Sequence, residues 1–153
     1  MKRWYVALWS ILLGGSSLVV GPAGAQAQLA TVSVTITGFK GTEGLALVTL
    51  YDNEQAWLKV PKAVQVVRAK ITGAGMTIEF KDVKPGTYAV SVIHDENKNN
   101  ELDMRWLPYP KPKEGNAVSN DPEQKAGPPK WEAAKFPVGG APASVKATLR
   151  YPS

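Results

Sequence analysis

The sequence predicts an all-β fold, a single antiparallel β-sandwich of about seven short strands interrupted by one long loop. Two observations lead to this prediction. Segments rich in β-branched residues recur between turns that are rich in Gly, Pro and Asn. No segment sustains the 3.6-residue apolar period of a helix, and residues 55–59 and 131–135 could each form one helical turn at most. A chain of 153 residues is long enough for one domain with a hydrophobic core.

The predicted strands can be assigned in order along the chain. Residues 30–37 alternate between β-branched apolar residues and Thr or Ser, as a strand with one buried face does. A turn containing Gly41 and Gly44 follows, and residues 45–51 form a second, more apolar strand. Further strands are expected at residues 64–71, 76–80, 87–93 and 145–151. Of these, 87–93 follows a Pro-Gly turn and has the strongest pattern of a buried strand.

Residues 1–27 have the features of a secretory signal peptide. Lys2 and Arg3 precede an apolar stretch over residues 4–20, and small residues of the A-x-A type follow it. An uncleaved membrane anchor is the alternative, but an apolar stretch of about 17 residues is at the short limit for crossing a bilayer. We therefore expect a mature domain over residues 28–153, secreted or periplasmic, with no stable membrane anchor after cleavage.

Composition excludes several classes of function. The chain has no cysteine, so disulfides, thiolate metal sites and thiol catalysis are ruled out, and with a single histidine a zinc site is not expected. Without Lys2 and Arg3, the 18 basic residues become 16 against 13 acidic residues, which leaves a net charge of +3. Because the lysines are scattered and do not alternate with aromatic residues, no nucleic-acid partner is expected.

Residues 94–137 are predicted to form one long loop inserted into the sandwich. They are rich in Pro, Gly, Asn and Lys and show little strand pattern. Loops of this length are usually either functional or disordered. This loop contains Trp106, Tyr109, Trp131 and Phe136, which are large enough to fasten it to a core, so we expect it to be ordered.

The loop begins with alternating side chains that carry oxygen: Asp95, Asn97, Asn99, Glu101 and Asp103. This spacing is similar to that of a calcium loop, in which such residues bind the ion at positions 1, 3, 5 and 9 and a backbone carbonyl binds at position 7. Asn100 stands at position 6, where glycine is usual, and can adopt the left-handed conformation required there. Trp106 stands at position 12 in place of the usual glutamate, so Glu114 or Asp121 would have to supply the missing carboxylate. We expect Ca²⁺ as the cofactor of this loop.

Two alternatives to a calcium site remain open. Asn and Asp side chains also bond their own backbone in exposed turns, so the loop could close without an ion. His94 precedes the loop and is expected to be a structural hydrogen-bonding residue. It could instead act as an acid–base pair with Asp95 or Asp103, although the protein is expected not to be an enzyme.

Aromatic residues in the loop suggest a binding surface. We consider His94, Trp106, Tyr109 and Trp131 as a ligand platform, because exposed aromatic side chains bind sugars and peptides. A carbohydrate or an envelope protein would be the partner. The alternative is that the aromatic residues, together with Trp57, only pack the loop onto the sandwich.

The segment FKDVKPGTYAVSVIHDENKNNELD, residues 80–103, resembles the core of the bacterial domain-of-unknown-function family 2141. The sequences KEG at 113–115, SN at 119–120 and GPPKWEAAKF at 127–136 are also similar to that family, and the likeness covers about residues 29–151. The P-G-x-Y element is shared with immunoglobulin-like and prealbumin-like sandwiches. The resemblance implies an exported sandwich of that kind with no assigned activity, in which H-D-x-N-x-N and L-D form one recurring unit.

We therefore expect an exported, non-enzymatic β-sandwich protein that acts as a binding module or as a structural protein of the envelope.

Overall fold

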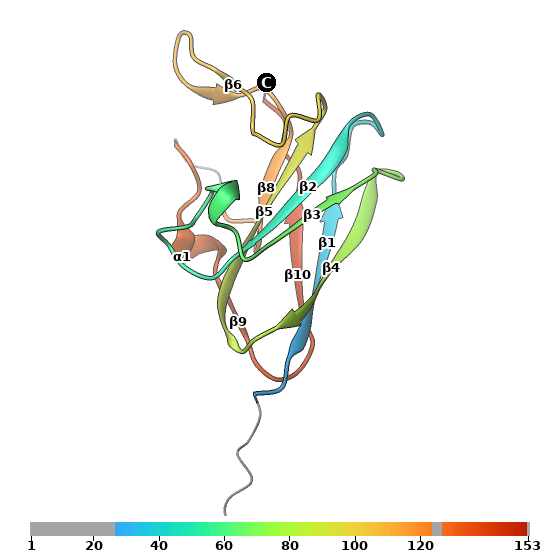
Figure 1. Ribbon diagram of the computed structural model, residues 1–153. Coiled ribbons are helices and arrows are strands. Elements are labelled where there is room, and N and C mark those ends of the chain that lie inside the picture. The colour runs from blue at the N-terminus through green and yellow to red at the C-terminus, as the bar shows by residue number, and fades with distance from the viewer. Residues whose placement is uncertain (1–26, 124–126, 153) are drawn as a thin grey trace, which may run out of the picture.

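The structure, a computed structural model, describes residues 27–123 and 127–152 (Figure 1). The predicted signal segment, residues 1–27, lies outside the described residues apart from its last residue. The elements in chain order are β1 (Ala30–Thr37), β2 (Leu45–Tyr51), the 3₁₀ turn η1 (Val60–Lys62), β3 (Gln65–Ala69), β4 (Gly75–Val83), β5 (Gly86–Asp95), β6 (Met104–Arg105), β7 (Lys111–Pro112), β8 (Asn116–Val118), α1 (Trp131–Ala134), β9 (Phe136–Val138) and β10 (Ala143–Thr148). All six strands expected from the sequence are present.

Two sheets pack face to face, which confirms the predicted all-β sandwich. One sheet has the order β10-β1-β4, and the other has the order β3-β2-β5-β8, with β9 paired to the first residues of β5. Within the described residues, the strand pairs are antiparallel except β1 with β10, which run parallel. This pair joins the first strand of the described chain to its last strand, so both ends of the domain lie in the same sheet.

The hydrophobic core lies between the sheets because alternate side chains of each strand point inward. In β1, Val32, Val34 and Ile36 are fully buried, as their alternation with Thr and Ser predicts. Each such side chain contributes about 1.5–3 kcal/mol when it leaves water. Strand β5 is buried on both faces, because α1 and a second apolar cluster cover its outer side.

The long loop contributes more regular structure than its sequence indicates. Within residues 94–137 the structure forms β8, which extends the second sheet at β5, and most of β9, which pairs with the start of β5. Strands β6 and β7 form a separate hairpin that projects from one end of the sandwich (Figure 1). These strands are two or three residues long. No alternation can be recognised over so few residues, so their partners decide where they form.

Helices are minor in the described part of the chain. The four-residue α1 falls in the predicted turn at 131–135, and η1 is a single 3₁₀ turn. No helix within the described residues is long and apolar enough to pass through a bilayer.

The turn between β1 and β2 packs directly against the start of the loop. Gly44 has φ +72°, and a Cβ atom on it would lie 2.2 Å from the carbonyl oxygen of Asp95 and 2.6 Å from Cα of Glu96. The position therefore requires glycine for two reasons, its left-handed conformation and the backbone that it contacts.

We expect Gly44→Ala to lower the free energy of unfolding by about 3 kcal/mol, because it adds an overpacked methyl group to a left-handed residue. Gly41→Ala in the same turn is the matched control, since a Cβ there meets no atom within 4 Å. Urea unfolding of both variants checks the prediction, and equal stabilities for the two would contradict it.

Candidate functional site

Asp95 ends β5 and organises the first half of the loop. Its side chain is fully buried, and its carboxylate accepts backbone N–H bonds from Asn99 at 3.0 Å and from Asn100 at 2.8 Å. These two donors offset the loss of water around a buried negative charge. Asn100 adopts φ +64°, the left-handed conformation that the spacing predicts for this position.

The side chains of Asn97 and Asn99 both accept and donate hydrogen bonds within the loop. Oδ1 of Asn97 accepts the N–H of Asn99 at 3.0 Å, and Oδ1 of Asn99 accepts the N–H of Glu101 at 2.9 Å. The Nδ2 groups of both asparagines donate to the carboxylate of Asp103, at 2.9 and 3.0 Å. Glu101 takes part through its backbone N–H, while its side chain is exposed. The loop is thus closed by its own side chains, the arrangement considered above as the alternative to an ion.

Glu114 lies within hydrogen-bonding distance of both ends of the loop. Its buried carboxylate accepts the N–H of Glu96 at 3.1 Å and the N–H of Asp103 at 3.2 Å. Of the two acids considered to complete the loop, Glu114 reaches it, whereas Asp121 binds the backbone N–H and hydroxyl of Thr148.

Burial raises the pKa of Glu114 above its ordinary range. The two backbone N–H bonds act in the opposite direction, and the negative charges of Asp103 and Asp95 add to the rise. Asp103 and Asp95 are therefore close enough to Glu114 to repel its negative charge.

These carboxylates do not form a metal site as they are arranged. Among the described residues, no group of three or more His, Asp and Glu side chains is positioned to hold a metal ion. The carboxylates of Asp95 and Glu114 face backbone N–H groups, and amide nitrogens, which are not ligands for Ca²⁺, face Asp103. Binding of Ca²⁺ would require the amides of Asn97 and Asn99 to present oxygen instead. Calcium binding therefore stays a prediction.

His94 is a buried structural residue in this arrangement. Its Nδ1 lies 2.6 Å from the hydroxyl of Tyr151 and its Nε2 lies 2.8 Å from the carbonyl oxygen of Glu43. A carbonyl only accepts, so we place the ring hydrogen on Nε2, and Nδ1 then accepts from Tyr151. Burial raises the pKa of the Tyr151 hydroxyl, which keeps the proton that it donates. Neither Asp95 nor Asp103 bonds to the ring, so the geometry gives no support to an acid–base pair.

Sequence reasoning missed Tyr151 and Gly115 as parts of this network. The ring of Tyr151 lies so close to Gly115 that a Cβ there would come within 2.5 Å of it, and the carbonyl of Gly115 accepts the backbone N–H of His94 at 2.8 Å. The signal available was the K-E-G sequence at residues 113–115. In the structure its Glu114 accepts hydrogen bonds from the loop, and its Gly115 accepts one from His94 and leaves room for the ring of Tyr151.

The proposed aromatic platform is divided by the structure. His94 and Trp131 are buried, and Trp131 packs edge-on against Trp57 at 5.8 Å beneath the loop, as the packing alternative predicts. Trp106 and Tyr109 are 69% and 54% exposed and lie on the β6–β7 hairpin. The four residues therefore do not share one surface, because His94 is buried against Tyr151 and Phe39 whereas Trp131 is buried against Trp57.

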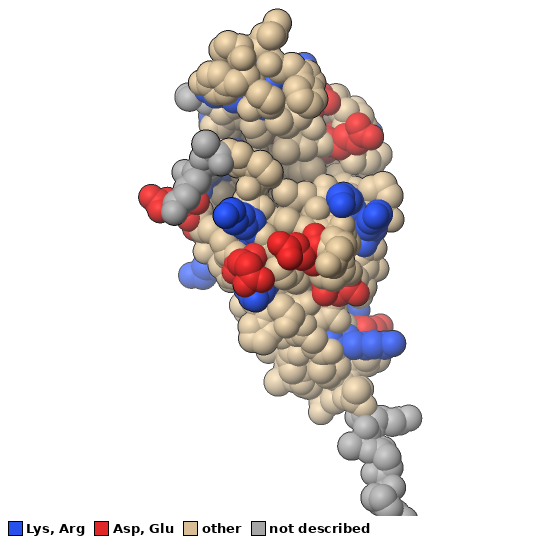
Figure 2. Space-filling view, turned by 90° about the vertical axis from the view of Figure 1, so that its left-hand side faces the viewer, with Lys and Arg blue, Asp and Glu red and all other residues tan. Residues whose placement is uncertain are grey.

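The exposed aromatic residues form a hairpin tip, by which we mean residues 106–110. Leu107 belongs to it and is 80% exposed. The top of the molecule, where Figure 1 places the hairpin, is mostly uncharged in Figure 2. The base of the hairpin is tied down, since the N–H of Lys113 donates to the carbonyl of Asp103 at 2.7 Å and Glu114 accepts from the N–H of Asp103.

A family model described as "Uncharacterized protein conserved in bacteria (DUF2141)" matches residues 34–146. This range covers more than half of the chain and contains the loop and the hairpin. No curated protein and no solved structure matches the chain.

The raised pKa of Glu114 predicts a pH-dependent contribution to stability. The folded state binds the Glu114 proton more tightly than the unfolded state does, so this contribution is greatest below the ordinary value of 4.5. It is lost as the pH rises through the raised folded pKa. We expect the stability of the wild type relative to Glu114→Gln to fall over that range, as urea unfolding at a series of pH values would measure. A difference that stays constant, or that rises with pH, would contradict the prediction.

Proposed function

The chain belongs to the bacterial DUF2141 family, and from that premise we propose that it is an exported binding module of the cell envelope and not an enzyme. The observation that carries the proposal is the exposure of Trp106, Leu107 and Tyr109 on one hairpin tip. Export rests on the signal features of residues 1–27.

An exposed apolar tip is a feature of binding surfaces. Three large apolar side chains within four residues expose more apolar surface than solubility favours, and contiguous patches of this kind mark interaction sites. Trp and Tyr also contribute a large share of the binding energy in known interfaces. A purely structural envelope protein with a loop closed by its own hydrogen bonds, the second class considered, has no need of such a tip.

The support beneath the tip also favours binding. Asp103 and Glu114 hold the base of the hairpin through backbone bonds, so less conformational freedom is lost when a partner binds. The groups that an enzyme would require are already engaged, since both ring nitrogens of His94 and both carboxylate oxygens of Asp95 have partners.

We expect the exported protein to sediment with isolated cell envelopes and the variant Trp106→Ala/Leu107→Ala/Tyr109→Ala to bind at least about tenfold more weakly, because it lacks the main apolar contacts. Leu29→Ala/Val64→Ala is the matched control, since both residues are large, exposed and outside the hairpin. Sedimentation over a range of envelope concentrations gives the affinities. Absence of binding, or equal loss in the control, would refute the proposed role.

We propose separately that Ca²⁺ binds the loop through Asp95, Asn97, Asn99 and Asp103, with the carbonyl of Glu101. One observation favours it: Asp103 and Asp95 lie close enough to Glu114 for their negative charges to add to the rise in its pKa that burial causes, and a cation would relieve that repulsion.

Saturating Ca²⁺ is expected to raise the melting temperature of the wild type, because an ion that binds only the folded state stabilises it. EDTA should reverse the rise, and Asp103→Asn should reduce it. Mg²⁺ at the same concentration is the control, since it prefers a smaller octahedral site. Melting temperatures of the wild type that are equal in Ca²⁺ and EDTA would show that hydrogen bonds alone close the loop.

A further inference from the structure

We propose that the partner of the hairpin tip is the surface of a membrane that contains anionic lipids. This inference rests on the proposed binding role of the tip and names the chemistry of what it binds. The contact would be peripheral and reversible, with the tip entering the headgroup region, and it requires no helix that crosses the bilayer.

The side chains of the tip suit the boundary between water and lipid. Trp106 and Tyr109 each combine a large apolar ring with one polar group, and such residues concentrate at membrane interfaces. Leu107 lies between them and is the most exposed large apolar residue in the described part of the chain. It can enter the acyl boundary while the two aromatic residues stay at the level of the headgroups.

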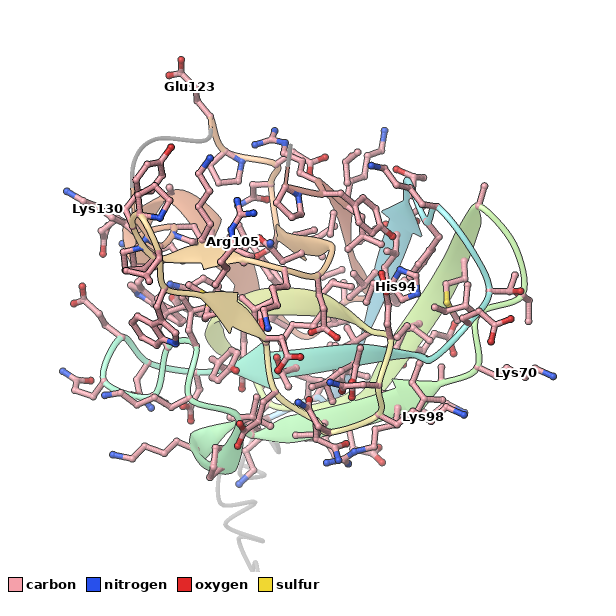
Figure 3. The ribbon with its side chains drawn as sticks, turned by 90° about the horizontal axis from the view of Figure 1, so that it is seen from above. Lys70, His94, Lys98, Arg105, Glu123 and Lys130 are labelled. Atoms are coloured by element: carbon pink, nitrogen blue, oxygen red, sulfur yellow. The ribbon has the colours of Figure 1, made fainter. Side chains whose placement is uncertain are left out.

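The charges around the tip complement an anionic surface. Residues 104–113 contain Arg105, Lys111 and Lys113 and no acidic residue. The ammonium group of Lys111 lies 4.8 Å from the centre of the Tyr109 ring, so a cation accompanies an aromatic side chain at the tip. Viewed from above, Arg105 and Lys130 lie on one side of the molecule, whereas Lys70 and Lys98 lie on the other (Figure 3).

The acidic side chains at the base of the hairpin are already engaged. The carboxylate of Asp103 accepts from Asn97 and Asn99, and Glu114 is buried against two backbone N–H groups. Glu123 extends toward the edge of the molecule in Figure 3, away from Arg105. Glu96 and Glu101 on the adjoining loop are exposed, so the apolar and cationic character belongs to the hairpin itself, residues 104–113.

The shape of the tip favours a lipid surface over a small ligand. The hairpin projects from the end of the sandwich, so its tip can meet a flat surface without the sheets interfering (Figure 1). Small ligands are usually held in concave sites lined by apolar side chains. The two cavities described in the molecule are lined by residues of 60–68 with 99–101 and by residues of 42–45 with Lys70 and Lys98, and neither includes the tip.

The experiment uses the protein purified after export, with vesicles of phosphatidylcholine alone and of phosphatidylcholine with phosphatidylglycerol. We expect binding to the mixed vesicles, and quenching of Trp106 emission by brominated lipid chains. Trp106→Ala/Leu107→Ala should weaken binding at least about tenfold, because each side chain loses its apolar transfer energy. The double variant Leu29→Ala/Val64→Ala should bind like the wild type.

The charge requirement is tested by a second variant. Arg105→Gln/Lys111→Gln/Lys113→Gln should lower binding to the mixed vesicles about fivefold for each charge removed. Lys62→Gln/Lys81→Gln/Lys146→Gln is the matched control, because it changes the net charge equally at exposed positions outside the hairpin. Salt at about 0.5 M should weaken wild-type binding, since it screens surface charges.

The outcomes separate this inference from the proposed function. Vesicle binding that depends on both the tip and its cations supports the inference. Absence of vesicle binding, with tip-dependent binding to cell envelopes retained, overturns the lipid partner and leaves a protein or a glycan. Vesicle binding that is equal in wild type and tip variant also overturns it. Loss of both kinds of binding would refute the binding role itself.

Discussion

The buried carboxylate of Glu114 is the constraint on which the functional end of this molecule depends. It accepts one backbone N–H at the start of the Asp/Asn loop and another at its end, so a single side chain sets the distance between Glu96 and Asp103. The same residue directly follows the hairpin and precedes β8. The loop, the base of the hairpin and the edge of the second sheet are therefore fixed relative to one another by one charged group.

A buried carboxylate at position 114 is electrostatically unfavourable, because burial removes water from its charge and because Asp103 and Asp95 repel it. The backbone N–H groups of Glu96 and Asp103 offset this loss of hydration by donating to the carboxylate. The same two bonds also fix the positions of two peptide groups of the loop. An apolar side chain in the same place could fill the space but would leave the loop amides without acceptors. The hydrogen-bonded base and the exposed apolar tip are thus successive parts of one short segment.

The alternation of apolar and polar residues made the long strands predictable from the sequence. The short strands show no such alternation and could not be predicted. Residues 30–37 and 45–51 show their buried faces directly, because several successive positions repeat the pattern. Strands β8 and β9 have three residues each and form because β5 offers them unpaired backbone groups. In the site, the spacing of Asp95 to Asp103 and the left-handed Asn100 could be anticipated from residue type. The sequence left open whether Glu114 or Asp121 completes the loop, and only the structure shows that Glu114 does so.

The sequence by itself determined the all-β class, the burial of the strand β5 and the polar loop after it, because these depend on local patterns of residue type. Only the tertiary structure decided which aromatic residues are exposed. Trp106 and Trp131 occur in the same long segment and are chemically identical, yet one projects from the hairpin and the other fills the space over β5. Exposure depends on contacts between segments far apart in the chain, and His94 meets Tyr151 for the same reason.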